Sequence, residues 1–277
     1  MENVLVTGGS GLVGSAIKKI YKKKYSHYNF IFLTSKDCDL TNIEQTITLF
    51  NHYKPVYVIH LAANVGGLFK NMNCKVEMLE KNLIINLNVL RACYFLGVKK
   101  CVSCLSTCIF PDKTKYPINE SMLHDGPPHL SNDAYAYSKR MLEIQSRAYQ
   151  EQYNKNFTCI IPTNIYGPND NYNLDDAHVI PALIHKCYLA KKNNNKFVVS
   201  GSGKPLRQFI FSEDLADLIL WYLFEINEKE TIILSVDEKD EISIQDVAKL
   251  ISDKFKCQIE FDTSKSDGQY KKTADNS

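Results

Sequence analysis

The chain has 277 residues, a formal net charge of +2, 44% hydrophobic residues and 23% charged residues. These values exclude a generally disordered protein, and the nearly balanced charge gives no reason to expect a nucleic acid or an acidic membrane as a partner. No apolar run approaches the ~20 residues that a membrane span needs.

The sequence opens directly on an apolar strand, MENVLVTGG, which leaves no room for a signal peptide. The nine cysteines are an odd number outside a secretory context, so we expect mostly free thiols and a cytoplasmic location. Cys101 and Cys104 form a C-x-x-C pair. Because strand side chains alternate and no second pair follows at zinc-ligand spacing, we expect no metal site.

Apolar strands alternate with helical stretches through the first half of the chain. The expected strands are Val4–Thr7, Phe30–Thr34, Val56–Leu61, Cys101–Ser106 and Thr158–Pro162. The expected helices are Leu12–Lys24, Ile43–Tyr53, an interval within Val76–Leu96, and Ala134–Tyr153. This alternation predicts a parallel sheet with crossover helices, and the continuous apolar strands are typical of strands buried on both faces.

The pattern changes after Tyr166-Gly167-Pro168. The elements expected there are a polar loop over Asn169–Asp176, helices around His178–Lys191, Asp214–Phe224 and Ile242–Phe255, and short strands within Asn193–Ser202, Phe209–Phe211, Ile232–Ser235 and Gln258–Phe261. We therefore predict an α/β fold with a Rossmann-type doubly wound parallel sheet and a smaller α+β C-terminal substrate domain. Residues 1–165 and about 206–235 would form the first, and about 166–205 and 236–277 the second. The polar tail Ser264–Ser277 carries no helix stop signal, which suggests further C-terminal structure.

The first strand leads into a glycine-rich turn and then a helix. Its residues are Gly8, Gly9, Ser10, Gly11, Leu12, Val13 and Gly14, which contain both G-x-x-G-x-x-G and G-x-G-x-x-G. In a dinucleotide-binding turn, one glycine allows a sharp bend, one lets the backbone approach a pyrophosphate, and one packs the helix on the strand. The amides at the helix start then face the negative charge. We expect a dinucleotide here.

The end of the second strand indicates which dinucleotide is bound. NAD enzymes usually carry an acidic residue there, for the ribose hydroxyls, whereas this chain has Leu33-Thr34-Ser35-Lys36. Lys36 can pair with a 2′-phosphate, which favours NADP, although Asp37 argues the other way. We place Asp39 near the adenine edge.

Four residues suggest chemistry at a carbonyl group. Tyr135 and Lys139 lie four apart on a predicted helix and so share a face. A nearby ammonium favours the phenolate and would lower the pKa of Tyr135, while Ser106 would donate to the same carbonyl oxygen. If the chain is extended from Ser106 to Cys108, both side chains face one way, roughly 6.6 Å apart, about the width of a sugar ring. Taken alone, a cysteine at a strand end is more often core filling.

These residues, with the glycine turn, resemble the extended short-chain dehydrogenase/reductase family over essentially the whole chain. Closer motifs are similar to those of its nucleotide-sugar epimerase–reductases. They are STCIFP from Ser106, PTNIYGP from Pro162, Asn169-Asp170-Asn171, HVIPAL from His178, and Ser266-Asp267-Gly268. The resemblance implies NADPH as cofactor and GDP-4-keto-6-deoxymannose as substrate. It also implies 3,5-epimerisation with 4-reduction, a homodimer built from two long helices per subunit, and further structure beyond Ser277.

The resemblance also assigns roles by position. Ser106, Tyr135 and Lys139 fall on the reductase set, and Cys108 and His178 on the acid/base pair of the epimerisation. The implied cofactor contacts outside the glycine turn are Lys36, Asp39, Leu61, Ala62, Ala63, Leu105, Tyr135, Lys139, Pro162, Asn164, Ile165 and His178. The implied substrate contacts are Ser106, Asn164, Lys186, Arg207 and Asp267. Two positions depart from the family pattern, because Lys186 replaces a frequent arginine and Ser200 replaces a tryptophan found in some relatives.

Several alternatives stay open at this point. The preferred assignment makes Cys108 the base and His178 the acid, but the sequence does not settle the direction, nor the preference for NADPH over NADH. A rival enzyme is another nucleotide-sugar epimerase or dehydratase on the same fold, which would recycle its nicotinamide. A rival outside catalysis is an NADP-sensing relative, although such proteins tend to lose the Tyr/Lys pair that is intact here.

Overall fold

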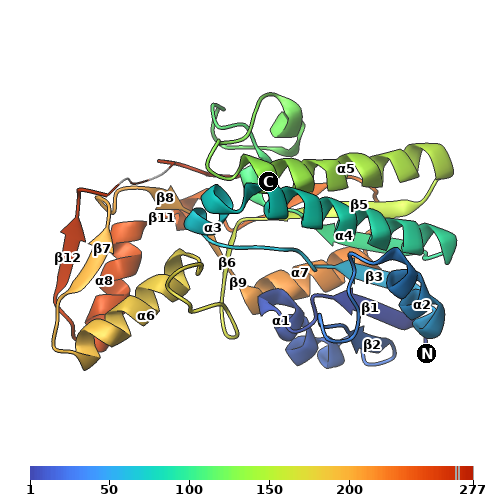
Figure 1. The fold of residues 1–277 in the computed structure, drawn as a ribbon, viewed down its shortest axis with the longest axis horizontal. Helices are drawn as coiled ribbons and strands as arrows, with labels where there is room; N and C mark the ends of the chain where they lie inside the picture. Colours follow the sequence, from blue (N-terminus) through green and yellow to red (C-terminus); the bar gives the residue numbers. More distant parts are fainter. Residues whose placement is uncertain (266, 268, 277) are drawn as a thin grey trace.

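A six-stranded parallel sheet forms the centre of the molecule in the computed structural model, which describes residues 1–265, 267 and 269–276 (Figure 1). Its strand order is β10-β5-β4-β3-β1-β2. The strands are β1 (Asn3–Thr7), β2 (Asn29–Phe32), β3 (Tyr57–His60), β4 (Lys100–Cys104), β5 (Asn156–Pro162) and β10 (Ile232–Leu234). All neighbouring pairs are parallel, which confirms the predicted doubly wound sheet.

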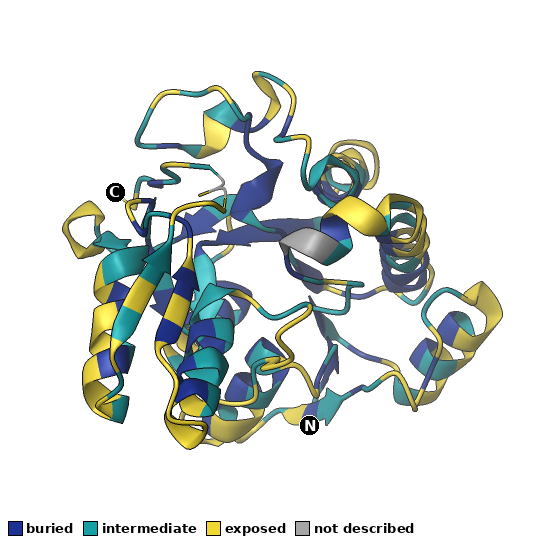
Figure 2. Cartoon of the chain, turned by 60° about the vertical axis from the view of Figure 1, so that its left-hand side comes forward, coloured by how far each residue is buried: buried dark blue, intermediate teal, exposed yellow. Residues whose placement is uncertain are grey.

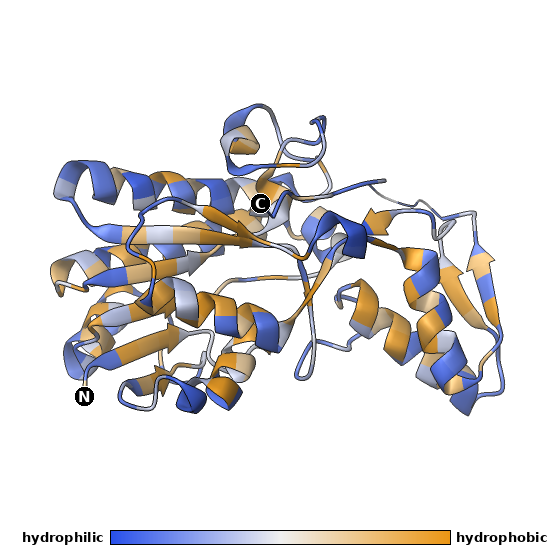
Figure 3. Cartoon of the chain, turned by 180° about the vertical axis from the view of Figure 1, so that it is seen from behind, coloured by the Kyte–Doolittle hydropathy of each residue, from blue (hydrophilic) through white to orange (hydrophobic). Residues whose placement is uncertain are grey.

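Helices cover both faces of this sheet. One face carries α1 (Leu12–Ile20) and α7 (Ser212–Phe224), and the other carries α2 (Ile43–Tyr53), α4 (Lys75–Phe95) and α5 (Asp133–Tyr153). Strand β1 shows why, since Val4 and Val6 enter the core under α1 and α7 while Leu5 enters the opposite core. Figure 2 shows the central strands as buried, and Figure 3 shows them as hydrophobic.

A separate, smaller core lies beyond the carboxyl edge of the sheet. Its elements are α6 (Val179–Lys192), β7 (Phe197–Ser200), α8 (Ile244–Phe255) and β12 (Ile259–Asp262). Two short ribbons connect the parts: β6 (Asn164–Tyr166) with β9 (Phe209–Phe211), and β8 (Leu206–Arg207) with β11 (Ile242–Ser243). The two cores support the predicted division into a cofactor domain and a substrate domain, whose boundaries stay a prediction.

Most expected elements are found, with three informative differences. The helix expected over Leu12–Lys24 ends at Ile20 and continues as a 3₁₀ turn over Tyr21–Lys23. The strand expected to reach Ser106 ends at Cys104. A short helix, α3 (Leu68–Asn73), was not expected. It matters for the site because its N-cap residue, Gly67, donates its amide to Asp176 O at 2.8 Å in the loop before α6.

The described part of the C-terminal tail is held against the body of the protein. The Tyr116 hydroxyl donates to the carbonyl of Lys271 at 2.7 Å. The Ile118 amide donates to Thr273 O at 2.8 Å, and the Asp275 amide donates back to Ile118 O. All nine cysteines are free, and none of the helices described is long and apolar enough to cross a membrane.

Candidate active site

The glycine turn has the shape that a pyrophosphate site requires. Gly8 has φ +70°, and a Cβ at this position would lie 2.9 Å from the Ala62 nitrogen. A Cβ on Gly14 would lie 2.5 Å from the carbonyl oxygen of Gly8, so only glycine lets α1 pack this closely on the turn. The Thr7 hydroxyl accepts the amides of Leu61 and Ala62, each at 3.2 Å, and so ties the end of β3 to the turn.

The other residues expected at the cofactor lie at the carboxyl edge of the sheet, in differing surroundings. Ser10 and Gly11 are exposed, Leu12 and Ala63 are half-buried, and Val13 and Leu105 are buried. The Val13 side chain packs in the core beside α1, so only its backbone faces the turn. Pro162 ends β5 as a buried residue, and Ile165 packs against the same core as Val13.

The loop after β2 is organised by its two aspartates. The Asp37 carboxylate accepts the Thr34 amide at 2.7 Å and the Thr34 hydroxyl at 2.8 Å, and these bonds lower the pKa of Asp37. Asp39 accepts the Thr41 hydroxyl and amide in the same manner, at 2.7 and 2.9 Å, and the pKa of Asp39 is lowered too. Lys36 directly precedes Asp37 and is exposed. Asp37 is thus engaged within its own loop.

The expected reductase residues meet where β4 ends. Ser106 caps a 3₁₀ turn, Thr107–Ile109, and its Oγ accepts the Cys108 amide at 3.4 Å. Tyr135 and Lys139 lie one turn apart near the start of α5, with the Lys139 Nζ 5.8 Å from the Tyr135 ring centre. Lys139 also donates to the carbonyl of Cys104 at 2.8 Å, which fixes the ammonium at the strand end.

The electrostatics of Tyr135 differ from the expectation. Burial raises the pKa of Tyr135 well above its usual value of 10.0, with Cys108 and Cys104 adding to the rise, so Lys139 does not lower it here. The cause is desolvation, which also lowers the pKa of Lys139. The phenol is therefore protonated at neutral pH, which is the form that a proton donor needs.

Cys108 lies beside this set but on a turn, so the expected extended spacing from Ser106 was wrong. The thiol is buried, and desolvation raises its pKa. The charge of Lys272, the Ser106 hydroxyl and the charge of Lys139 oppose that rise. Lys272 was missed by the sequence reasoning, since a lysine pair in a polar tail carries no local signal. The tail contacts described above place Lys272 here.

His178 stands at the first turn of α6, exposed, as its N-cap residue. Asp170 precedes it in the same loop. One carboxylate oxygen of Asp170 accepts the Asn171 amide, while Oδ2 is buried without a hydrogen-bond partner among the described residues. Burial raises the pKa of Asp170, and the Asn171 amide and then the charge of His178 oppose this rise. Asp170 is therefore a partly buried carboxylate near His178 that lies outside the predicted set of site residues.

The expected substrate residues are only partly free to bind a ligand. Asn164 donates through its side chain to Gln208 O at 3.0 Å. The Arg207 guanidinium donates to the carbonyls of Leu206 and Gln269, at 2.7 and 2.6 Å. Burial lowers the pKa of Arg207. Arg207 also donates to Tyr270 O at 3.3 Å, so it anchors the tail. Among the described residues, these three bonds leave two of its five N–H donors for a ligand.

Two further substrate residues differ in how well the structure supports their prediction. Asp267 is exposed, and its carboxylate accepts the amide and hydroxyl of Ser202 at 2.5 and 2.7 Å. It closes the loop after β7, so its expected ligand contact has little support. Lys186 is half-buried on α6. The neighbours Ser266 and Gly268 of the quoted motif lie outside the described residues.

The chain is similar to known proteins over nearly its whole length. Residues 4–235 match the model of the NAD dependent epimerase/dehydratase family. The chain is 59% identical over 278 residues to the GDP-L-fucose synthase of Dictyostelium discoideum, covering 99% of this chain and 87% of that protein. It is 50% identical over 286 residues to a probable GDP-L-fucose synthase of Drosophila melanogaster, covering 100% and 89%.

A solved structure gives the same result for the fold. The crystal structure of a GDP-L-fucose synthetase from Naegleria fowleri bound to NADP matches with a TM-score of 0.94 and 53% sequence identity. The match covers 99% of this chain and 84% of that chain.

Proposed function

Because the chain belongs to the NAD dependent epimerase/dehydratase family, we propose that it is an NADPH-dependent epimerase–reductase that converts GDP-4-keto-6-deoxymannose into GDP-L-fucose. The relatives named GDP-L-fucose synthase support this proposal at 59% and 50% identity. The observation that carries it is the thiol of Cys108 placed within electrostatic reach of Tyr135 and Lys139. A reductase alone has no use for a buried proton acceptor at that place.

The epimerisation follows from the acidity of protons next to a ketone. Ser106 and Tyr135 hydrogen-bond the C4 oxygen and stabilise the enolate that forms when a neighbouring C–H loses its proton. We assign Cys108 as the base at C3 and C5 and His178 as the acid that delivers a proton to the opposite face of the ring. Burial raises the pKa of Cys108, and the charge of Lys272 and the Ser106 hydroxyl oppose that rise and so favour the thiolate that this role requires.

The reduction uses the same oxygen contacts. When bound, NADPH supplies the hydride that C4 receives. Tyr135, protonated at neutral pH, gives its proton to the C4 oxygen. The glycine turn and the start of α1 would hold the pyrophosphate, and Lys36 would hold the 2′-phosphate. The engagement of Asp37 with Thr34 supports NADP over NAD, because it occupies the carboxylate that would otherwise bind the ribose hydroxyls.

We further propose that the protein is a homodimer formed through α4 and α5. The large apolar side chains exposed on these two helices are Val76, Ile84, Leu87 and Phe95 on α4, and Tyr137, Met141, Ile144 and Tyr153 on α5. Helices α4 and α5 lie side by side, and apolar side chains exposed together mark protein interaction sites. A cytoplasmic location stays a prediction, which the free cysteines support.

The test is incubation of the protein with GDP-4-keto-6-deoxymannose and NADPH in D₂O. We expect GDP-L-fucose with deuterium at C3 and C5 and one NADPH consumed per product. Cys108→Ser should suppress deuterium incorporation without weakening NADPH binding, and Tyr135→Phe should suppress reduction. Turnover without net NADPH consumption would instead identify an epimerase or dehydratase that recycles its nicotinamide.

A further inference from the structure

The loop that ends at His178 is held by hydrogen bonds between its own residues. The Ala177 amide donates to Asn173 O at 2.8 Å, and the Asn171 side chain donates to the Asp176 carboxylate at 2.7 Å. Because His178 directly follows Ala177 in the chain, a displacement of Asp176 or Ala177 would disturb these bonds and shift His178.

A backbone hydrogen bond joins this loop to the N-terminal part of the chain, which includes the glycine turn. Of the hydrogen bonds found among the described residues, only the one from the Gly67 amide to Asp176 O makes that connection, at 2.8 Å. Gly67 caps α3 with φ −66° and ψ −176°, which any residue can adopt. Its lack of a side chain therefore serves the contact and not the backbone conformation.

The approach at Gly67 is too close for a side chain. A Cβ there would lie 2.9 Å from Ala177 O and 3.1 Å from Asp176 O, both backbone atoms. Ordinary van der Waals separation is about 3.5 Å, so the loop would have to retreat by about half an ångström. Because both obstructing atoms are backbone, no rotamer change can relieve the clash.

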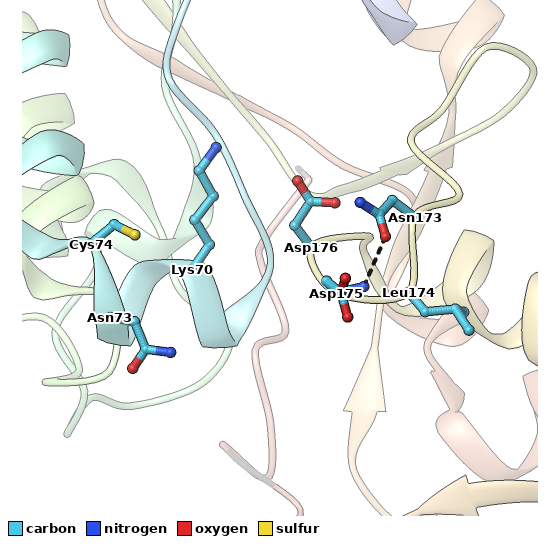
Figure 4. Close-up of a pocket in the computed structure, with 7 residues that line it drawn as sticks. All are labelled: Lys70, Asn73, Cys74, Asn173, Leu174, Asp175 and Asp176. Carbon is cyan, nitrogen blue, oxygen red and sulfur yellow. Dashed lines mark hydrogen bonds between the residues drawn. The ribbon is translucent and has the colours of Figure 1, made fainter.

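Beside Gly67 the two sides do not pack against each other. A cavity of about 510 Å³ separates Lys70, Asn73 and Cys74 from the loop residues Asn173–Asp176, as Figure 4 shows. Ser106, Tyr135 and Lys139 do not line this cavity. The loop is thus supported on this side at Gly67 and left unsupported next to it.

We propose that Gly67 is a positioning residue that sets how closely His178 approaches the substrate ring opposite Cys108. This inference rests on the proposed function and deepens it. Proton delivery needs the imidazole within hydrogen-bond reach of the carbon, and a misplacement of ~1 Å can cost about 100-fold in rate. The contact of Gly67 with the loop would serve epimerisation, whereas Ser106 lies on the turn after β4 and Tyr135 and Lys139 lie on α5, so that reduction would not depend on it.

The test uses Gly67→Ala in the full chain, with Gly126→Ala as the matched control. A Cβ on Gly126 would meet Pro111 at an ordinary 3.4 Å. We expect Gly67→Ala to slow deuterium incorporation at C3 and C5 by about 10- to 100-fold. NADPH affinity should stay within about twofold, and the control should match the wild type in both. In a His178→Gln background, Gly67→Ala should not slow deuterium incorporation any further, because a residue that acts through His178 has no effect once His178 is replaced.

Amide hydrogen exchange provides a readout that does not depend on turnover. Gly67→Ala should accelerate exchange in the loop and in the first turn of α6, while the glycine turn stays protected. Equal costs of Gly67→Ala with and without His178 would overturn the inference, and so would unchanged protection of the loop. If the wild type shows no deuterium incorporation at all, the proposed function fails, and the amide exchange still decides whether Gly67 holds the loop.

Discussion

A buried histidine, His60, links β1, just before the glycine turn, to α5 through hydrogen bonds, and its titration should be visible in the stability of the protein. His60 is the last residue of β3. Its Nδ1 shares a hydrogen bond with the Thr7 hydroxyl at 2.8 Å, and its Nε2 shares one with Asn86 Oδ1 at 3.1 Å. Asn86 in turn donates to the carbonyl of Ser138 on α5 at 3.4 Å. Desolvation first, and then the charge of Lys139, lowers the pKa of His60 to about 3.

The sign of the effect follows from proton binding in the two states. The native protein keeps His60 neutral down to about pH 3, whereas the unfolded chain protonates it below its ordinary pKa of 6.5. The unfolded state therefore binds more protons between those values, and stability falls as the pH falls through that window. At about 1.36 kcal/mol per pKa unit, the protonation of His60 in the unfolded chain lowers the free energy of unfolding by about 2 kcal/mol between pH 8 and pH 5.

The assay is urea unfolding of the wild type and of His60→Gln at pH 8, 7, 6 and 5. The amide can still hydrogen-bond but cannot titrate, so the variant should be less stable at pH 8 and should lose less stability on acidification. The other histidines titrate in both proteins and cancel in the difference. We expect the gap in the free energy of unfolding to narrow by about 2 kcal/mol from pH 8 to pH 5. A gap that is constant with pH would refute the assignment of a neutral, buried His60.

Three further predictions concern the site. Gly14→Ala should weaken NADPH binding at least tenfold, measured by fluorescence titration, because its Cβ would meet Gly8 O at 2.5 Å; unaltered binding would remove the turn from the cofactor site. Since burial raises the pKa of Cys108, deuterium incorporation at C3 and C5 should increase with pH above neutrality. Lys272→Met should move that rise to higher pH, and a profile independent of pH would exclude the thiol as base. Lys36→Glu should weaken NADPH binding far more than NADH binding, and equal losses would place the 2′-phosphate elsewhere.

Elements with a strong local signal were predicted well from the sequence. The helix Ile43–Tyr53 has Asn42 as its N-cap residue, whose side chain accepts a hydrogen bond from the Gln45 amide. Its C-cap residue is Lys54, which has a left-handed backbone conformation. The boundaries of that helix follow from local chemistry and match the prediction. The glycine turn was also predictable from its sequence. A Cβ at its glycines would contact atoms a few residues away in the turn or atoms at the end of a neighbouring strand.

What the sequence could not show depends on contacts between distant segments. The strand at Cys101 was expected to reach Ser106, but a turn begins there, held partly by Arg140 Nε donating to Ile109 O at 2.6 Å from α5. The predicted lowering of the Tyr135 pKa was wrong because desolvation, which arises only in the folded protein, raises that pKa, and Cys108 and Cys104 add to the rise. Lys272 could not be predicted from the sequence either. Its position near Cys108 depends on hydrogen bonds such as that from the Tyr116 hydroxyl to Lys271 O, which joins residues more than a hundred positions apart.

The turn at Ser106 brings the Cys108 amide to the Ser106 hydroxyl, an arrangement that an extended strand would not allow. Because the Cys108 amide donates to Ser106 Oγ, it uses a lone pair of that oxygen and leaves the hydroxyl hydrogen available. The same hydrogen can stabilise the thiolate of Cys108 or donate to the substrate ketone. In the proposed mechanism, the thiolate loses its negative charge as it takes a proton from carbon, at the moment when negative charge develops on the ketone oxygen. One serine would therefore stabilise the thiolate first and the ketone oxygen second, which would couple the acidity of the substrate to the basicity of the thiol.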